Sequence, residues 1–377
     1  MTSLDTVFKA YDIRGLVPDE LNTDLARRVG GAFARLAGAK PVGEETGLGD
    51  IKADILSGAP DRPAPRRGES HSLDLLPDYA AHVHSFADVN AIRPLKIVAD
   101  TANGMGGLAL PSVMKSLPVD VEILFEELDG TFPNHPADPI NPANQVDLIA
   151  RVRATGADVG LAFDGDADRV FLVDEQGVGL SGSTTTGMLA AKLLDRNPGA
   201  TVIHNLICSR AVPEVIREHG GVPVVERVGH SFIKAKMAET NAIFGGEHSA
   251  HYYFRDNYFA DSGLIAAIMM LELLSRATQP LSELRKPFER YVASGEINTR
   301  VADPKASIEK VAQRFAYLPQ DRLDGLTVNG GDTWWFNVRP SNTEPLLRLN
   351  VEAADPDRMA ALRDEVLAVI TQSPLSA

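Results

Sequence analysis

Apolar and polar positions follow two alternating patterns from Ile92 onward, which predict strands and helices in turn. Short apolar runs predict strands, and the stretches between them carry apolar residues at helical spacing, as Val146, Ile149 and Val152 do. The strands predicted in this first stretch are 95–100, 121–127, 159–163 and 170–174. Alternation of this kind is typical of α/β domains with largely parallel sheets.

A second α/β stretch and a different last unit follow. The second stretch has predicted strands at 201–206, 222–228 and 241–247 and predicted helices at 211–221, 231–239 and 261–276. The last unit has strands at 296–301, 333–340 and 346–353 and a closing helix at 356–370, with Asp355 as its N-cap. The sequence therefore predicts boundaries that divide the chain into 1–91, 92–199, 200–290 and 291–377.

The first ninety residues do not show the same alternation. One short strand, 8–13, is followed by a helical stripe of Leu25, Val29, Phe33 and Leu36, and a second stripe runs from Leu73 to Phe86. A single strand cannot form a sheet, so these amphipathic helices have no sheet of their own to cover. We expect them to leave apolar surface exposed.

Composition and charge narrow the class of protein. With 377 residues, 44% of them hydrophobic, the chain is long enough for two to four domains. Its net charge of -14 argues against nucleic acid and anionic membrane surfaces as partners. A single cysteine, Cys208, excludes internal disulfides and fits a reducing compartment. No signal peptide is recognised and the longest apolar run, Leu264–Leu271, is too short to cross a bilayer, so we expect a cytoplasmic protein of undetermined oligomeric state.

The segment DGDADR carries the sharpest chemical signal. It places Asp164, Asp166 and Asp168 at alternate positions in a turn between two predicted strands, where their oxygens can converge on one hard cation beside Arg169. A solvated acidic turn is the competing interpretation. An EF-hand would require glycine at the sixth position and flanking helices, and a phosphatase of the haloacid dehalogenase type would require Thr or Val where Asp168 stands.

The segment RPSNTEPLLR predicts a phosphate site. Arg339 and Arg348 offer planar donor forks, and Ser341, Asn342 and Thr343 offer hydroxyl, amide and backbone donors in a turn. Standing alone, the segment is more typical of a polar turn with structural arginines than of a phosphate site.

Three weaker patterns complete the candidates. Glu247 and Ser249, at the end of a predicted strand, suit recognition of sugar hydroxyls, whereas the neighbouring His248 and His251 are more typical of surface or packing histidines. His230 and Lys234 lie four residues apart at the start of a predicted helix, where His230 is a candidate general acid or base. Tyr11 and Arg14 follow the first strand, and Arg14 is a candidate phosphate ligand.

Taken in order, the segments FKAYDIRG, DGDADR, VGHSFIK, GEHSAHYYF and RPSNTEPLLR resemble the α-D-phosphohexomutase superfamily, specifically its bacterial phosphomannomutase/phosphoglucomutase branch. The resemblance implies four domains around a cleft, with three α/β domains and a C-terminal α+β domain. It implies one Mg²⁺ on the three aspartates, Arg169 near the transferred phosphoryl group, and Glu247 and Ser249 on the sugar. Residues lining the site or holding the other phosphate would be Tyr11, Arg14, His230, Lys234, Arg339, Ser341, Asn342, Thr343 and Arg348.

One departure from this family is large. Members carry a serine loop of the form TASHNP in the first domain, whose phosphoserine exchanges a phosphoryl group with hexose phosphates through a hexose 1,6-bisphosphate. Here the sequence passes from AFARLAGAK directly to PVGEETGLGD, so we expect an internal deletion near Gly38–Pro41 and a truncated first domain. Ser70-His71 is a poor substitute, and Ala250 stands where glycine is common.

Two hypotheses follow from the resemblance and the departure. The first is a phosphomannomutase/phosphoglucomutase that interconverts hexose 1- and 6-phosphates, without normal turnover in this chain because the serine loop is absent. The second is a non-catalytic protein that binds Mg²⁺ and phosphosugars. The sequence does not distinguish mannose from glucose as the preferred sugar.

Overall fold

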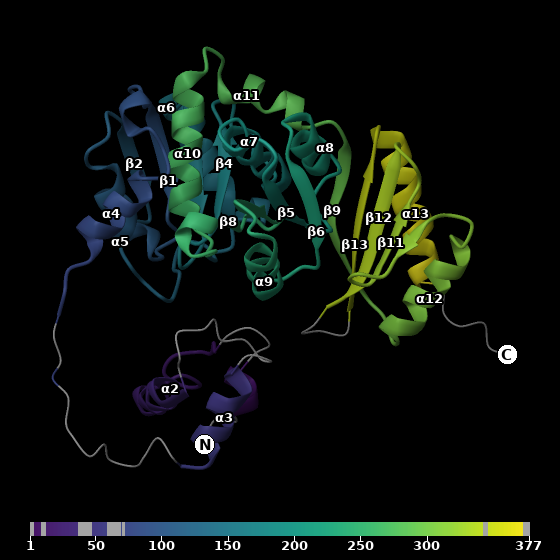
Figure 1. The fold of residues 1–377 in the computed structure, drawn as a ribbon, viewed down its shortest axis with the longest axis horizontal. Helices are drawn as coiled ribbons and strands as arrows, with labels where there is room; N and C mark the ends of the chain where they lie inside the picture. The colour runs from purple at the N-terminus through teal and green to yellow at the C-terminus, as the bar shows by residue number, and fades with distance from the viewer. Residues whose placement is uncertain are drawn as a thin grey trace. The chain divides into compact units, whose positions relative to one another are not determined.

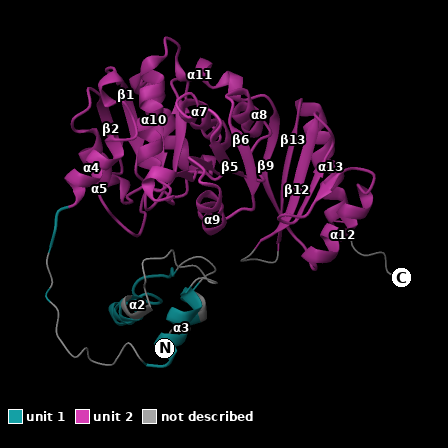
Figure 2. Cartoon of the chain, viewed as in Figure 1, with its two compact units in different colours: residues 1–74 teal, residues 75–377 magenta. Residues whose placement is uncertain are grey.

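The computed structural model describes residues 4–8, 13–36, 47–58, 69, 72–341 and 346–371. The chain forms two compact units, residues 1–74 and residues 75–377, coloured separately in Figure 2.

The first unit is helical in its described part. Its helices are α1 (Leu4–Val7), α2 (Thr23–Leu36) and α3 (Leu48–Leu56). A small core formed by Ala32 of α2 and by Ile51 and Ile55 of α3 joins the two longer helices. The predicted helical stripe is confirmed as α2, but Phe33 on it is 48% exposed. Of the strand predicted at 8–13, the described ends form one isolated β-bridge between Phe8 and Ile13, and the junction near Gly38–Pro41 lies outside the described residues.

The second unit begins with a four-stranded sheet and its helices (Figure 1). The strands are β1 (Lys96–Asp100), β2 (Asp120–Leu124), β3 (Val159–Phe163) and β4 (Val170–Asp174). Their order is β2-β1-β3-β4; β1 is parallel to β2 and β3, whereas β3 and β4 form an antiparallel hairpin. The connections include α5 (Gly106–Met114), η4 (Pro142–Gln145) and α6 (Val146–Thr155). The apolar runs VGLAF and VFLVD are buried at every position, as expected of central strands covered on both faces.

A second sheet repeats the same arrangement. Its strands are β5 (Thr201–Asn205), β6 (Val222–Glu226), β7 (Phe244–Gly246) and β8 (Tyr252–Phe254), in the order β6-β5-β7-β8. Again two pairs are parallel and the last pair is an antiparallel hairpin. The connections are α8 (Ala211–Glu218), α9 (His230–Thr240) and, after the hairpin, η5 (Arg255–Asn257).

The helices that follow the two hairpins are exchanged between the sheets. Helix α7 (Gly182–Leu194) follows β4 but packs against α8 and β7, whereas α10 (Gly263–Arg276) follows β8 but packs against β4 and α4 (Leu76–His84). One continuous hydrophobic core therefore spans both sheets. Ala80 and Val83 of α4 are buried in this core, so the expectation that the second amphipathic helix is uncovered is wrong; α5 and α10 both pack against it.

The C-terminal part is a five-stranded antiparallel sheet with two helices. Its order is β10-β11-β12-β13-β9. The strands are β9 (Val292–Arg300), β10 (Gln320–Asp321), β11 (Leu326–Asn329), β12 (Trp334–Pro340) and β13 (Leu346–Ala353). Helices α12 (Pro304–Arg314) and α13 (Pro356–Thr371) cover one face through a separate hydrophobic core, and Asp355 accepts a hydrogen bond from the Arg358 N–H as the predicted N-cap of α13. The fold is thus the mixed α/β class that the sequence predicts.

Short helices complete the second unit: η3 (Val89–Ala91), α11 (Leu281–Leu284) and η6 (Lys286–Phe288). In the described part of the chain, no single helix has the length and apolarity needed to cross a membrane. Helix α10 meets that requirement only together with residues Leu281–Phe288, at a bend of 97°, and most of α10 is buried in the protein core.

Candidate functional site

The turn between β3 and β4 brings the three predicted metal ligands together. Carboxylate oxygens of Asp164, Asp166 and Asp168 lie within 4.8 Å of one another. The turn rests on the loop after β1, where Met105 N–H donates to the Gly165 carbonyl at 2.9 Å. A Cβ on Gly104 would lie 2.5 Å from the same carbonyl oxygen, so a glycine is needed for this close approach. The glycine-rich segment TANGMGG therefore supports the acidic turn.

The electrostatics of the turn favour a cation. Burial, with the nearby charge of Asp164, raises the pKa of Asp166 and raises that of Asp168 to about 8. The Oδ1 atom of Asp168 is buried without a hydrogen-bond partner. A bound divalent ion would supply that partner and would offset the repulsion between the carboxylates, so these residues fit Mg²⁺.

Arg169 closes the turn. Its Nε donates to Asp164 Oδ2 at 2.7 Å and its backbone N–H donates to Asp164 Oδ1 at 3.1 Å. Asp164 is only 3% exposed, and this bidentate contact fixes the carboxylate in one orientation. The rest of the guanidinium group is partly exposed, with Nη1 3.9 Å from Asp138. Arg169 is therefore held beside the predicted cation position.

The second hairpin, between β7 and β8, carries the predicted sugar ligands. Glu247 is buried, and its carboxylate accepts hydrogen bonds from Asn205 Nδ2 at 3.0 Å and from the Tyr253 hydroxyl at 2.6 Å. Ser249 is partly exposed, and its hydroxyl lies 3.0 Å from His251 Nδ1. The structure therefore fixes Glu247 through two neutral donors and leaves Ser249 nearer the surface of the hairpin.

The two hairpins touch each other. Arg169 and His251 form an isolated antiparallel bridge between them, and His251 Nε2 lies 3.7 Å from Asp168. The same nitrogen lies 4.0 Å from Asp261, at the start of the segment leading into α10. His251 thus joins the acidic turn to the hairpin of β7 and β8, which we call the sugar hairpin after its predicted ligand; its interpretation as a surface or packing histidine stays a prediction.

His230 and Lys234 lie on α9, as predicted. His230 is the first residue of the helix, after Gly229, whose φ of 133° favours glycine. Burial, followed by the charge of Lys234, lowers the pKa of His230, so the imidazole is neutral near pH 7. Lys234 Nζ pairs with Asp261 at 3.0 Å, which connects α9 to the carboxylate near His251.

The two arginines of the predicted phosphate site face each other across β12 and β13. Arg339 and Arg348 are direct cross-strand partners, and both contact Glu296 of β9, at 2.8 Å and 3.3 Å. The Nε atoms of both arginines are buried without a hydrogen-bond partner. One carboxylate thus orients two guanidinium groups while leaving donors available for an anion.

One of these arginines, Arg339, also lies within electrostatic range of the sugar hairpin. Burial lowers the pKa of His248 in that hairpin; the charge of Glu296 raises it and the charge of Arg339 lowers it, each to a smaller extent. Ser341, whose N–H donates to the Leu346 carbonyl at 2.9 Å, directly follows β12. Asn342 and Thr343 lie outside the described residues, as does Tyr11. Arg14 is an exposed residue of the first unit, and its N–H donates to the Val7 carbonyl.

Sequence reasoning missed four residues of this arrangement: Asn205, Tyr253, Asp261 and Glu296. Asn205 and Glu296 stand on strands, remote in sequence from the residues they hold, and no local pattern marks them. Tyr253 is two residues beyond His251 in GEHSAHYYF, and Asp261 directly precedes Ser262, the N-cap of α10.

Comparisons with known proteins agree with this architecture. Family models for phosphoglucomutase/phosphomannomutase match as alpha/beta/alpha domain II over residues 77–177, alpha/beta/alpha domain III over 181–291 and the C-terminal domain over 296–369. A phosphomannomutase of Salmonella typhimurium is 35% identical over 460 aligned residues, covering 99% of this chain and 100% of the relative.

Two solved structures extend the comparison. A phosphoglucomutase/phosphomannomutase family protein of Burkholderia thailandensis is 27% identical, with a TM-score of 0.86 over 98% of both chains. An N-acetylphosphoglucosamine mutase of Aspergillus fumigatus, solved in complex with GlcNAc-6P and magnesium, shares the fold with a TM-score of 0.59 at 15% identity, over 78% of this chain and 70% of that one.

The fold and site thus define a multidomain α/β protein of the phosphohexomutase superfamily. The chain belongs to the phosphoglucomutase/phosphomannomutase family, a family of mutases that are classed as isomerases.

Proposed function

We propose that this chain binds hexose phosphates and one Mg²⁺ at the surface formed by the two hairpins and the paired arginines, as an interconverting mutase of hexose 1- and 6-phosphates would. The observation that carries the proposal is the contact between the acidic turn and the sugar hairpin through Arg169 and His251, with Arg339 within electrostatic range of the same hairpin. Mannose and glucose phosphates are both candidate substrates.

The side chains divide the work of binding and proton transfer. Arg339 and Arg348, with the turn of Ser341, Asn342 and Thr343, would hold the phosphate that is not transferred, since two guanidinium groups oriented by one carboxylate match its oxygens. Glu247 and Ser249 would bind the sugar hydroxyls, with Lys234, Tyr11 and Arg14 as further ligands. Arg169 would lie beside the transferred phosphoryl group.

His230 is the candidate proton carrier. Its lowered pKa keeps the imidazole neutral near pH 7, so one ring nitrogen can accept a proton from a sugar hydroxyl and later return it. When bound to Asp164, Asp166 and Asp168, Mg²⁺ would neutralise negative charge on the phosphoryl group.

The nucleophile is the missing part. In a mutase of this family the phosphoserine gives its phosphoryl group to the sugar hydroxyl, and the resulting hexose 1,6-bisphosphate returns the other phosphoryl group to the serine. No TASHNP-type loop occurs in the sequence. The alignment with the Salmonella relative spans 460 positions although this chain has 377 residues, which supports an internal gap. We therefore propose that turnover is absent or strongly impaired and that the retained activity is binding, with the division 1–91, 92–199, 200–290 and 291–377 describing a truncated first domain and three complete ones.

Replacement of Asp166 tests the metal site, because Asp166 is the exposed member of the three aspartates. The Asp166→Ala substitution removes one of the three carboxylate ligands. It should therefore weaken Mg²⁺ binding by about tenfold or more, measured by isothermal titration calorimetry. The matched control is Asp120→Ala, an exposed aspartate at the start of β2. Equal Mg²⁺ affinity in both variants would show that the acidic turn is merely solvated.

A coupled assay tests turnover. The chain should show no conversion of mannose 1-phosphate or glucose 1-phosphate with Mg²⁺ and a hexose 1,6-bisphosphate, because no phosphoserine forms. Intact-mass analysis after incubation with the bisphosphate should show no stable phosphate adduct. Turnover comparable to that of complete relatives, or such an adduct, would mean that another serine has taken over and that the binding-only interpretation is wrong.

A further inference from the structure

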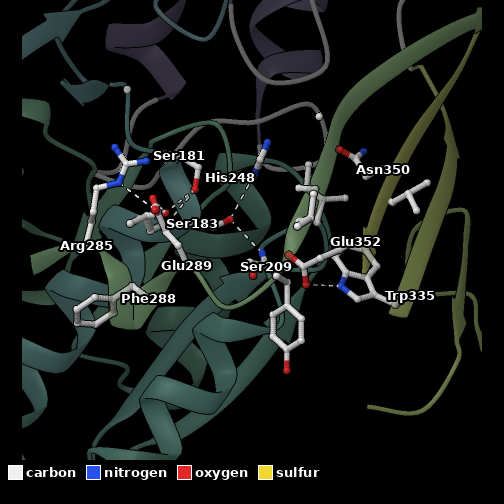
Figure 3. Close-up of a pocket in the computed structure, with 18 residues that line it drawn as sticks. Ser181, Ser183, Ser209, His248, Arg285, Phe288, Glu289, Trp335, Asn350 and Glu352 are labelled. Carbon is white, nitrogen blue, oxygen red and sulfur yellow. Dashed lines mark hydrogen bonds and ion pairs between the residues drawn. The ribbon is translucent and has the colours of Figure 1, made fainter. Parts of the chain in front are cut away.

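A cavity of about 380 Å³ lies behind the sugar hairpin, between the start of α7 and the C-terminal sheet. Figure 3 shows Trp335, Asn350 and Glu352 on the side of that sheet, Arg285, Phe288 and Glu289 on the opposite side, and Ser183, Ser209 and His248 between them. None of the described residues of the candidate metal and phosphate sites lines it. The volume falls in the lower part of the range typical of pockets for small molecules.

The charged groups of the cavity wall are already paired. Arg285 contacts both Asp174 and Glu289, each at 2.9 Å. Glu352 accepts hydrogen bonds from Trp335 Nε1 at 2.8 Å and from the Arg210 N–H at 2.9 Å. With the carboxylates and the guanidinium group satisfied by the protein, the wall offers no spare charge to hold an anion or a cation.

What the wall does offer is an unpaired amide. Asn350 is 6% exposed, lines the cavity, and has a buried Nδ2 with no hydrogen-bond partner. Its direct cross-strand neighbour, Asn337, is fully buried with an equally unpartnered Oδ1. Buried amide groups without partners destabilise the folded state and call for an explanation. A ligand hydroxyl group can accept from an amide N–H and also donate to an amide oxygen, and in a cavity without a ligand water molecules would do the same.

The rest of the lining suits the carbon skeleton of a sugar. Ser183 and Ser209 contribute further hydroxyl groups, while Ile207, Phe288 and Trp335 contribute apolar surface. Apolar and aromatic surface with a few fixed polar groups is the usual composition of a small-molecule site. A neutral polyol combines hydroxyl groups with apolar C–H surface, and it carries no charge that the wall would leave unpaired.

We propose that this cavity binds one unphosphorylated monosaccharide, at a site separate from the phosphosugar site. The bound sugar would accept a hydrogen bond from Asn350 Nδ2 and pack against Trp335. Because His248 in the wall belongs to the hairpin that carries Glu247 and Ser249, occupancy of the cavity would favour one position of that hairpin. The proposal goes beyond mutase activity and does not require it.

The site is tested by measuring the binding of D-glucose and D-mannose with saturation-transfer NMR and calorimetry, in the absence of Mg²⁺ and phosphate. We expect saturable binding that Asn350→Leu weakens at least tenfold and that the exposed control Asn90→Leu leaves unchanged. Ala293→Phe, at an exposed cavity-lining residue, should also abolish binding by filling the entrance, and it covers the case in which Asn350→Leu does not fold.

Three results would overturn the proposal. The first is no saturable binding of either sugar, which would make the cavity a water-filled space. The second is binding that survives both cavity variants. The third is binding that is lost in Ser249→Ala, which would place the sugar at the front of the hairpin. Failure here leaves the phosphosugar proposal standing, because that proposal is tested by Mg²⁺ and hexose phosphate binding.

Discussion

The two α/β sheets of this chain share one strand order, β2-β1-β3-β4 and β6-β5-β7-β8, but carry different chemistry on their hairpins. Each hairpin turn begins with a buried carboxylate, Asp164 in one and Glu247 in the other, and each has an alanine at its fourth position with positive φ, Ala167 at 62° and Ala250 at 65°. The strain at Ala250 explains why glycine would be suitable at that position.

The difference lies in what surrounds each carboxylate. Asp164 is held by Arg169 and is followed by two further aspartates, so the first turn concentrates negative charge and fits a cation. Glu247 is held by the neutral donors Asn205 and Tyr253, so the second turn presents a fixed carboxylate suited to hydroxyl groups. One scaffold therefore carries two turns, called the metal turn and the sugar turn after their proposed ligands, and side chains on neighbouring strands give each turn its different surroundings.

The largest effect should come from breaking the exchange of helices between the two sheets. Glu272 on α10 is fully buried and contacts Lys192 of α7 at 2.7 Å, with Arg196 and Arg276 alongside. Glu272→Ala leaves the largely buried Lys192 without its partner and should lower the free energy of unfolding by about 3–5 kcal/mol, measured by urea denaturation. Glu283→Ala, at an exposed glutamate, should change it little. A loss below about 1 kcal/mol in Glu272→Ala would mean that the apolar core alone holds the exchanged helices.

The two sheets should differ in how their stability depends on pH, because His204 occupies the position on β5 that Ala99 occupies on β1. Burial lowers the pKa of His204 to about 4, below its value in an unfolded chain. As the pH falls from about 6.5 to 4, the unfolded chain takes up the proton first, so folding loses up to about 3 kcal/mol in that window. Urea denaturation at pH 7 and pH 4.5 should show this loss reduced in His204→Leu and unchanged in His219→Gln, an exposed histidine. Equal acid sensitivity in all three proteins would exclude His204 as the cause.

The smallest of these effects concerns the glycines behind each turn. A Cβ on Gly104 would lie 2.5 Å from the Gly165 oxygen under the metal turn, and one on Gly182 would lie 2.3 Å from the His248 oxygen under the sugar turn. Gly104→Ala and Gly182→Ala should each lower the free energy of unfolding by about 1–3 kcal/mol, because the added methyl group forces the neighbouring backbone to move. Calorimetry should show that Gly104→Ala alone reduces the affinity for Mg²⁺. Gly182→Ala should reduce the affinity for hexose phosphate more than Gly104→Ala does. Gly130→Ala, with no atom within 4 Å, is the control, and identical ligand-binding losses in both turn variants would contradict independent support.

Much of the fold follows from local sequence pattern. The runs VGLAF, VFLVD and LLRLNVEA are found as strands with the predicted bounds, because continuous apolar or alternating runs between turn residues leave little choice. The three-residue strand β8, the short β10 and helix α5 behind TANGMGG were not predicted, because tertiary pairing rather than local pattern forms them. The exchange of α7 and α10 could not be predicted either, because the apolar residues of a helix show that it covers a sheet but not which sheet it covers.

The candidate site, like the fold, was predictable where its residues lie in one continuous motif. Its acidic turn and arginine pair stand in compact motifs, and the structure brings the members of each described motif together. Residues that orient them, such as Asn205 and Glu296, act across strands and have no sequence neighbour that identifies them.

The exchanged helices have a consequence for dissecting the chain. A fragment ending near Asn197–Gly199 would contain every strand of the first sheet but would lose α10, which supplies one of its covering layers. A fragment beginning there would keep α10 with nothing to cover and would lack α7. The two halves are therefore complementary pieces of one folding unit, and co-expression of both, rather than either alone, is the route to a soluble split form.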